Sequence, residues 1–211
     1  MRLLGLILTL AAALDVAAHD APVSSGAQAQ ALPLTGAALV QALRHGGYVL
    51  VMRHASSPFT PPTKDTADPE NTRLERQLDE PGRKAAHDMG VAIKQLGVPI
   101  GAVLSSPTYR ARQTVQLAAL GVPIIVRELD EPARGMQADA DTAQAAYLRK
   151  EVAQRPRDAT DTILVTHTPN ITAAFGSSVK DVAPGESLVF QPDGKGSAQL
   201  VGRIKAAEWQ Q

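Results

Sequence analysis

The sequence predicts a three-layer α/β/α sandwich with a mostly parallel central sheet. Short apolar runs typical of buried strands recur along the chain, and longer helix-like segments separate most of them. Strands that alternate with helices form a parallel sheet with helices on both faces. The chain has 211 residues, the length of one ordinary α/β domain, and it shows no internal repeat.

The first elements of the sandwich lie in the N-terminal half. A helix is expected over residues 36–45, because two glycines follow it and glycine commonly ends helices. Residues 48–53, YVLVMR, form a compact apolar run, which predicts a buried strand. Residues 56–78 are rich in Pro, Asp and Thr and predict a long loop. Residues 79–97 predict a helix with acidic side chains at its start.

The alternation continues through the rest of the chain. Further strands are expected at residues 99–106, 123–129 and 158–167, and further helices at residues 107–121, 140–156 and 170–175. The C-terminal residues 187–209 predict two strands joined by the turn PDGKG. In such folds, ligands bind beyond the carboxyl ends of the parallel strands. The polar residues that follow each strand are therefore the candidates for function.

The N-terminal residues have the layout of a secretory signal peptide. A basic residue is followed by an apolar run over residues 3–14, which is short for a membrane span. The alternatives are an uncleaved anchor and a buried helix. We expect a signal peptide over residues 1–18, a flexible linker over 19–33 and one domain over 34–211. This organisation predicts a periplasmic or secreted protein without stable membrane insertion.

The composition argues against several classes of function. The formal net charge is +0, which disfavours nucleic-acid binding driven by bulk charge. The chain has no cysteine, and therefore no disulfide, thiolate nucleophile or zinc–thiolate site. The sequence shows no coiled-coil pattern, and it does not indicate an oligomeric state.

Two Arg-His pairs lie close together in the sequence. Arg44–His45 ends the first helix, where the helix dipole favours positive charge, so a structural role is expected. Arg53–His54 lies at the carboxyl end of the first strand, and its side chains are expected in the crevice where ligands bind. The second pair is therefore the predicted functional one.

Polar side chains also follow the other strands at the same edge of the sheet. They are Ser105, Ser106 and Arg110 after the second strand, Glu128, Asp130 and Glu131 after the third, and His167 after the fourth. Each residue alone has a structural or solvated interpretation. Their convergence predicts one crevice with two histidines, two arginines and at least one carboxylate.

Such a crevice suits phosphoryl transfer. Guanidinium groups present planar donors that match phosphate oxygens. A neutral histidine is a nucleophile towards phosphorus, and neighbouring arginines lower the pKa of His54 and keep it neutral. A nearby carboxylate can protonate the leaving group and then activate water. Because cationic side chains stabilise the charge that a metal otherwise would, we expect no metal and no other cofactor.

Four motifs stand in the order LVMRHASS, LERQLDEPGRKAA, LSSPTYRARQT and LVTHTPN. This set resembles the histidine phosphatase superfamily in its phosphoglycerate mutase-like branch 1, from about Tyr48 to the end of the chain. The resemblance implies a phosphoglycerate mutase-like fold and a phosphorylated histidine at His54. It also implies that Arg53 and Arg110 bind phosphate and that His167 is the second histidine of the site.

The chain departs from the family pattern at two places. Ala55 stands where glycine is commoner, and alanine is small enough for activity to be expected. Thr168 follows the second histidine, so the adjacent Asp of phytase-like relatives is absent. In the mutase-like branch the acid follows a Leu-x-Glu pattern, which by resemblance makes Glu131 the general acid. Glu128 is the second candidate, and either carboxylate could simply be solvated.

Other residues near the motifs receive structural interpretations. Arg73 and Arg76 precede QLDEPG, and solvated charge is preferred for both over a place in the pocket. Glu186 either caps the crevice or begins a strand. No nucleophile-elbow pattern surrounds Ser105 and Ser106, which argues against a serine hydrolase and leaves them as hydrogen-bond donors.

The predicted function is that of an exported, metal-independent phosphomonoesterase that forms a phosphohistidine. Its substrate is expected to be a small phosphorylated molecule, with phosphosugars as one class. One alternative is a non-catalytic phospho-ligand binding or regulatory module, which would lack the acid. The other is a protein-phosphohistidine phosphatase, which the compact size suggests and the predicted export disfavours.

Overall fold

The computed structural model describes residues 33–132, 139–179 and 181–210, and its centre is a six-stranded sheet. The strands are β1 (Val49–Arg53), β2 (Ile100–Ser105), β3 (Ile124–Ile125), β4 (Asp161–Thr166), β5 (Ser187–Pro192) and β6 (Ala198–Ile204). Their order across the sheet is β3-β2-β4-β1-β5-β6. The first four strands in this order pair in parallel, whereas β5 and β6 pair antiparallel. The predicted mostly parallel sheet is therefore confirmed.

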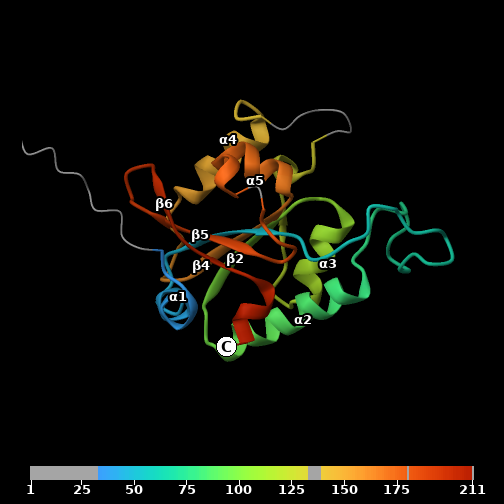
Figure 1. The fold of residues 1–211 in the computed structure, drawn as a ribbon, viewed down its shortest axis with the longest axis horizontal. Helices are drawn as coiled ribbons and strands as arrows, with labels where there is room; N and C mark the ends of the chain where they lie inside the picture. Colours follow the sequence, from blue (N-terminus) through green and yellow to red (C-terminus); the bar gives the residue numbers. More distant parts are fainter. Residues whose placement is uncertain (1–32, 133–138, 180, 211) are drawn as a thin grey trace, which may run out of the picture. The chain divides into compact units, whose positions relative to one another are not determined.

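Helices cover both faces of the sheet, as predicted for a three-layer sandwich. They are α1 (Gly36–Leu43), α2 (Glu80–Gln95), α3 (Tyr109–Leu117), α4 (Ala143–Val152) and α5 (Thr168–Phe175), with short 3₁₀ helices η1 (Arg127–Leu129), η2 (Ser177–Val179) and η3 (Ala206–Gln210). Figure 1 shows α1, α2 and α3 on one face and α4 and α5 on the other.

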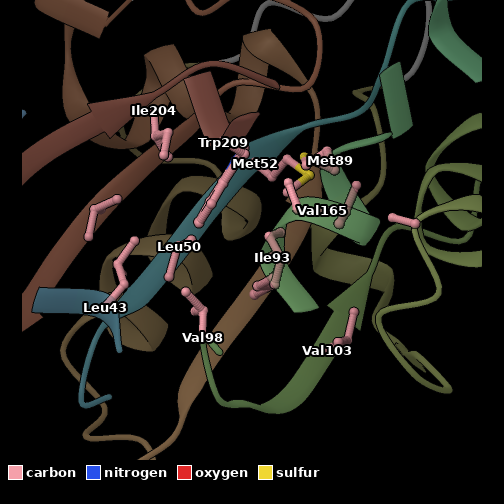
Figure 2. Packing of buried hydrophobic residues seen from close by; sticks show 14 of the residues in the cluster. Leu43, Leu50, Met52, Met89, Ile93, Val98, Val103, Val165, Ile204 and Trp209 are labelled. Atoms are coloured by element: carbon pink, nitrogen blue, oxygen red, sulfur yellow. The ribbon is translucent and has the colours of Figure 1, made fainter. Parts of the chain in front are cut away.

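Strand β1 contributes side chains to two hydrophobic cores, one on each face of the sheet. Successive side chains of a strand point to opposite faces. Accordingly, Leu50 and Met52 join the core under α1, α2 and α3 (Figure 2), while Val49 and Val51 pack towards α4 and α5. Each of these side chains is at most 1% exposed. Full burial of such a side chain contributes roughly 1.5–3 kcal/mol, so the strand that carries Arg53 and His54 is held firmly from both sides.

The start of α2 is fixed against the turn that follows β1. Asp79 caps the helix, because its Oδ1 accepts a hydrogen bond of 2.8 Å from the Gly82 amide. Its other oxygen, Oδ2, accepts a hydrogen bond of 2.7 Å from the Ser56 hydroxyl. Gly82 passes so close to the Ser56 carbonyl oxygen that a Cβ atom would overlap it. These contacts tie the far end of the long loop back to the residues beside His54.

The structure differs from the prediction at the third strand. Residues 123–129 were expected to form a strand, but β3 contains only Ile124 and Ile125, and both side chains are exposed. Among the described strands it lies at the edge of the sheet and pairs with β2, after which the chain turns into η1. An apolar run does not reveal whether it lies in the middle of a sheet or at its edge.

The predicted signal peptide over residues 1–18 and nearly all of the predicted linker over 19–33 lie outside the described residues. Within the part of the chain that the structure describes, none of the helices has the length and apolar character needed to cross a membrane.

Candidate active site

The two predicted histidines leave the sheet side by side. His54 follows the last residue of β1, and His167 follows the last residue of β4. These strands are parallel neighbours, with Arg53 opposite Thr166, and the backbone amide of His54 donates to the Thr166 carbonyl. The two imidazole ring centroids are 5.2 Å apart. The pairing of β1 with β4 thus brings together two residues that are far apart in the sequence.

The first Arg-His pair lies elsewhere. Arg44 and His45 come directly after α1 and before β1, at the edge of the sheet where the parallel strands begin. The His45 ring nitrogen Nδ1 lies 2.8 Å from the Gln41 carbonyl oxygen, one turn back in the helix. This local contact at a helix end agrees with the structural role predicted for the pair.

Arg110 contacts several other residues of the site. It lies in the first turn of α3, and its side chain is buried. Its Nε donates to His54 Nε2 at 3.1 Å, and its Nη2 donates to His167 Nδ1 at 3.1 Å. Nη2 also forms an ion pair of 2.6 Å with Glu131 Oε2. One guanidinium group therefore contacts three of the other predicted site residues.

The hydrogen bonds of His54 fix its tautomer. Nδ1 lies 2.7 Å from the Ala55 carbonyl oxygen, which can only accept, so Nδ1 carries the proton. Nε2 is then unprotonated and points its lone pair at Arg110. The pKa of His54 is lowered to about 3, mainly by burial and also by the charges of Arg110 and Arg53, against the Ala55 bond, which raises it. The sequence predicted that arginines lower the pKa of His54, but burial is the larger cause.

His167 has the opposite tautomer. Its Nδ1 accepts from Arg110, so the proton is on Nε2, which lies 2.9 Å from the hydroxyl of Ser106. The ring is 1% exposed, and burial, followed by the charge of Arg110, lowers the pKa of His167 well below its ordinary value. Ser106 is also buried, so this contact orients the imidazole ring. Both histidines are therefore neutral near pH 7, and the positive charge of the site comes from arginines.

Arg53 is held by the segment that leads into β5. Its Nη1 donates to the Val182 carbonyl oxygen at 2.8 Å, and its backbone amide donates to the Glu186 carbonyl oxygen. The Glu186 side chain does not cap the crevice. It is buried, and it accepts from the Arg203 Nε at 2.7 Å and from the Ala183 amide. Glu186 thus stabilises the segment that positions Arg53.

The two candidate acids have different surroundings. The side chain of Glu131 is 41% exposed and contacts Arg110, whereas Glu128 is exposed on η1 and acts electrostatically on Tyr147 of α4. The segment before Glu131 is held by Asn170, whose Nδ2 donates to the Asp130 carbonyl oxygen at 2.7 Å. Of the two carboxylates, the structure brings only Glu131 into contact with the site.

Arg76 was not expected at the site. The sequence favoured a solvated charge, but the side chain is only partly exposed and donates to the carbonyl oxygens of Pro58 at 2.7 Å and Ser57 at 3.2 Å. Its charge lowers the pKa of both His54 and His167. The position of Arg76 depends on how the long loop folds, and nothing in the local sequence pattern distinguishes it from Arg73.

The long loop is ordered by polar contacts with α2 and α3. Asp68 forms an ion pair of 2.7 Å with Arg83 and accepts a hydrogen bond of 2.7 Å from the Gln113 side chain. Asn71 is buried, and its Nδ2 donates to the Glu75 carbonyl oxygen at 2.7 Å. These contacts involve residue types that sequence patterns usually assign to solvent.

Two neutral histidines in contact with Arg110, and within the electrostatic reach of Arg53 and Arg76, form a cluster suited to a phosphoryl group at the carboxyl edge of a parallel sheet. The model of the histidine phosphatase superfamily (branch 1) matches residues 49–182, and the chain belongs to this superfamily. The superfamily supports a phosphatase that works through histidine. Among the described residues, no three His, Asp or Glu side chains are grouped so as to hold a metal ion.

Solved structures share this fold at low sequence identity. The protein histidine phosphatase SixA complexed with tungstate is 20% identical, with a TM-score of 0.54 over 76% of this chain and 97% of that chain. A phosphoserine phosphatase mutant from Entamoeba histolytica in complex with phosphoserine is 13% identical, with a TM-score of 0.51 over 76% and 98%. These likenesses confirm the phosphoglycerate mutase-like α/β fold. Among curated proteins, none matches the sequence significantly.

Proposed function

We propose that the protein is a metal-independent phosphomonoesterase that forms a phosphohistidine at Nε2 of His54. The observation that carries this proposal is the tautomer of His54. Its Nδ1 is bound to the Ala55 carbonyl oxygen, so the lone pair of Nε2 faces the arginine that would bind phosphate. Because the pKa of His54 is lowered to about 3, Nε2 stays unprotonated throughout the physiological pH range.

In the first half of the reaction, Arg53 and Arg110 bind the phosphate oxygens. Nε2 of His54 attacks phosphorus, and the bond from phosphorus to the ester oxygen breaks. Glu131, in its protonated form in the substrate complex, donates a proton to the departing oxygen. The negative charge of the phosphoryl group favours a second proton on His167, whose Nδ1 can then donate to the same oxygens. In the second half, Glu131 takes a proton from water, the water oxygen attacks phosphorus, and the bond from phosphorus to Nε2 breaks. The electron pair returns to Nε2 of His54, and inorganic phosphate leaves.

The contact between Glu131 and Arg110 favours an enzyme over a binding module. A module that only binds phosphate needs the arginines but not a carboxylate, whose negative charge would oppose the ligand. Here Glu131 lies 2.6 Å from Arg110, and its side chain is 41% exposed, so a leaving group and water can reach it. The loss of a general acid typically costs about 10²–10⁴-fold in rate, so turnover of an alkyl phosphate separates the two functions.

We further propose that the enzyme acts outside the cytoplasm on a small phosphorylated molecule, for which a phosphosugar is one candidate. The predicted signal peptide supports the location, and the small set of charged groups in the site supports a small ligand. A protein phosphohistidine is the alternative substrate. Assays with sugar phosphates and with a phosphohistidine-containing protein side by side would distinguish them.

The central test is hydrolysis of an aryl phosphate in the presence of a chelator. We expect the wild type and His45→Ala to turn over at similar rates, because His45 lies at the opposite edge of the sheet. His54→Ala should be inactive, and acid-quenched wild type should carry acid-labile phosphate on histidine. A wild type without activity, or His54→Ala with wild-type activity, would show that the phosphohistidine mechanism does not apply.

A further inference from the structure

Arg76 lies over the start of the helix that carries Arg110. On one side of it, Glu75 Oε2 accepts a hydrogen bond of 2.8 Å from the backbone amide of Tyr109. On the other side, the backbone amide of Leu78 donates to Gln113 Oε1 at 2.7 Å. Tyr109 and Gln113 belong to the first turns of α3. The backbone around Arg76 is therefore fixed along the same turns from which Arg110 enters the site.

The guanidinium group of Arg76 also holds the turn that follows His54. It donates from Nε to Pro58 and from Nη2 to Ser57, and its central carbon lies 5.1 Å from the ring centroid of Phe59. These bonds use two of the five N–H donors of the guanidinium. Phe59 is 88% exposed, so this stack lies at the surface of the protein. Arg76 is thus held in place while donors remain for an anion.

The charge of Arg76 acts on the whole site. It lowers the pKa of His54 and of His167, and the pKa of Arg76 itself is lowered by burial and by the charges of Arg110 and Arg53, against the effect of Glu131. Since both histidines are neutral, Arg53, Arg76 and Arg110 supply the positive charge. In the free protein, Glu131 offsets one of these three charges, which leaves two.

We propose that Arg76 is a specificity-determining residue that binds the phosphoryl group as a third arginine and selects dianionic phosphate over monoanionic groups. This inference rests on the proposed function of the site. A phosphate monoester carries two negative charges above its second pKa of about 6, whereas a diester carries one at any neutral pH. A site with two net positive charges favours the monoester dianion, and removal of one charge reduces that preference.

The test compares two inhibitors that differ by one charge. Phenylphosphonate is a dianion at alkaline pH, and its monomethyl ester is a monoanion of nearly the same shape. Inhibition constants are measured against an aryl phosphate for the full-length wild type, Arg76→Met, Arg76→Lys and Arg73→Met. Arg73 is the matched control, because it lies in the same loop, is mostly exposed and pairs with Glu75.

Arg76→Met should weaken the binding of phenylphosphonate by about ten- to a hundredfold, the usual effect of losing one or two hydrogen bonds to a charged group. It should weaken the binding of the monomethyl ester less, so that the preference for phenylphosphonate, given by the ratio of the two inhibition constants, falls. Arg76→Lys keeps the charge and should restore most of the ratio. Arg73→Met should match the wild type. An unchanged ratio in Arg76→Met, or no recovery in Arg76→Lys, would overturn the inference and leave Arg76 as an anchor of the turn.

A binding measurement separates this inference from the proposed function. Inorganic phosphate raises the melting temperature of any variant that binds it, with or without turnover. Phosphate should stabilise His54→Ala and stabilise His54→Ala/Arg76→Met much less. If the wild type hydrolyses esters but Arg76→Met has the same inhibition constants as Arg73→Met, only the inference about Arg76 is wrong. An active His54→Ala defeats the proposed function. If Arg76→Met folds poorly without phosphate, Arg76→Lys and Arg76→Gln carry the comparison.

Discussion

The buried carboxyl of Asp161 should make the stability of the protein fall as pH rises. Asp161 begins β4, its side chain is 0% exposed, and Oδ1 accepts one hydrogen bond of 2.9 Å from the Tyr48 amide. Oδ2 has no hydrogen-bond partner among the described residues. Burial raises the pKa of Asp161 from 3.8 to about 7, against the Tyr48 bond, which lowers it. The folded protein therefore keeps a proton that the unfolded chain releases near pH 4.

The sign and size of the effect follow from this difference. Between about pH 4 and pH 7 the folded state binds more protons than the unfolded state, so the free energy of unfolding decreases with pH. The difference between the two pKa values corresponds to up to roughly 4 kcal/mol, a large share of the roughly 5–15 kcal/mol of a typical domain. Asp161→Asn is neutral at every pH and should lose this dependence.

Urea unfolding followed by circular dichroism at pH 5, 6, 7 and 8 would measure the effect. We expect Asp161→Asn to be less stable than or equal to wild type at pH 5 and clearly more stable at pH 8. Asp65→Asn, in an exposed part of the long loop, should run parallel to wild type. Parallel curves for Asp161→Asn and wild type would mean that Asp161 is ionised in the folded protein, and the reasoning would fail.

Three further changes test the site and its support. Glu131→Gln should lower kcat on alkyl phosphates by about 10²–10⁴-fold and on aryl phosphates far less, because aryl oxides leave without a proton; equal losses on both would remove Glu131 as the acid. Asn170→Ala releases the Asp130 carbonyl, so it should lower the free energy of unfolding by about 1–3 kcal/mol. It should also reduce the turnover of alkyl phosphates more than that of aryl phosphates. A wild-type ratio of alkyl to aryl turnover would contradict this. Gly82→Ala should cost about 1–3 kcal/mol in chemical denaturation through overlap with Ser56, and an unaffected midpoint would show that α2 can shift.

The parts of the fold that the sequence predicts best are those with strong local patterns. The run YVLVMR alternates its side chains between two cores, and it could be placed as a buried strand without knowledge of its neighbours. The short strand β3 could not, because Ile124 and Ile125 have the residue types of a buried strand but lie at the edge of the sheet. Whether a strand has one neighbour or two depends on the pairing of the whole sheet.

The site was predictable where it depends on strand ends and not where it depends on loop folding. His54, Arg110 and His167 follow from the rule that parallel strands place their carboxyl ends at one edge. Arg76 reaches the site only because Asp68, Asn71 and their partners fold the long loop against α2 and α3. Such contacts between residues far apart in the sequence leave no periodic signal. Ser106, which the sequence placed at the same edge as a hydrogen-bonding residue, contacts His167 there.

The contact between Arg110 and His54 links phosphate binding to the reactivity of the nucleophile. In the free protein, the Nε–H of Arg110 points at the lone pair that must attack phosphorus. An N–H bonded to that lone pair occupies it, so the resting histidine is a poorer nucleophile. A negatively charged phosphate oxygen is a stronger acceptor than a neutral imidazole nitrogen. Under the proposed mechanism, the incoming phosphoryl group therefore draws Arg110 away from His54 and frees the lone pair only when an electrophile is present.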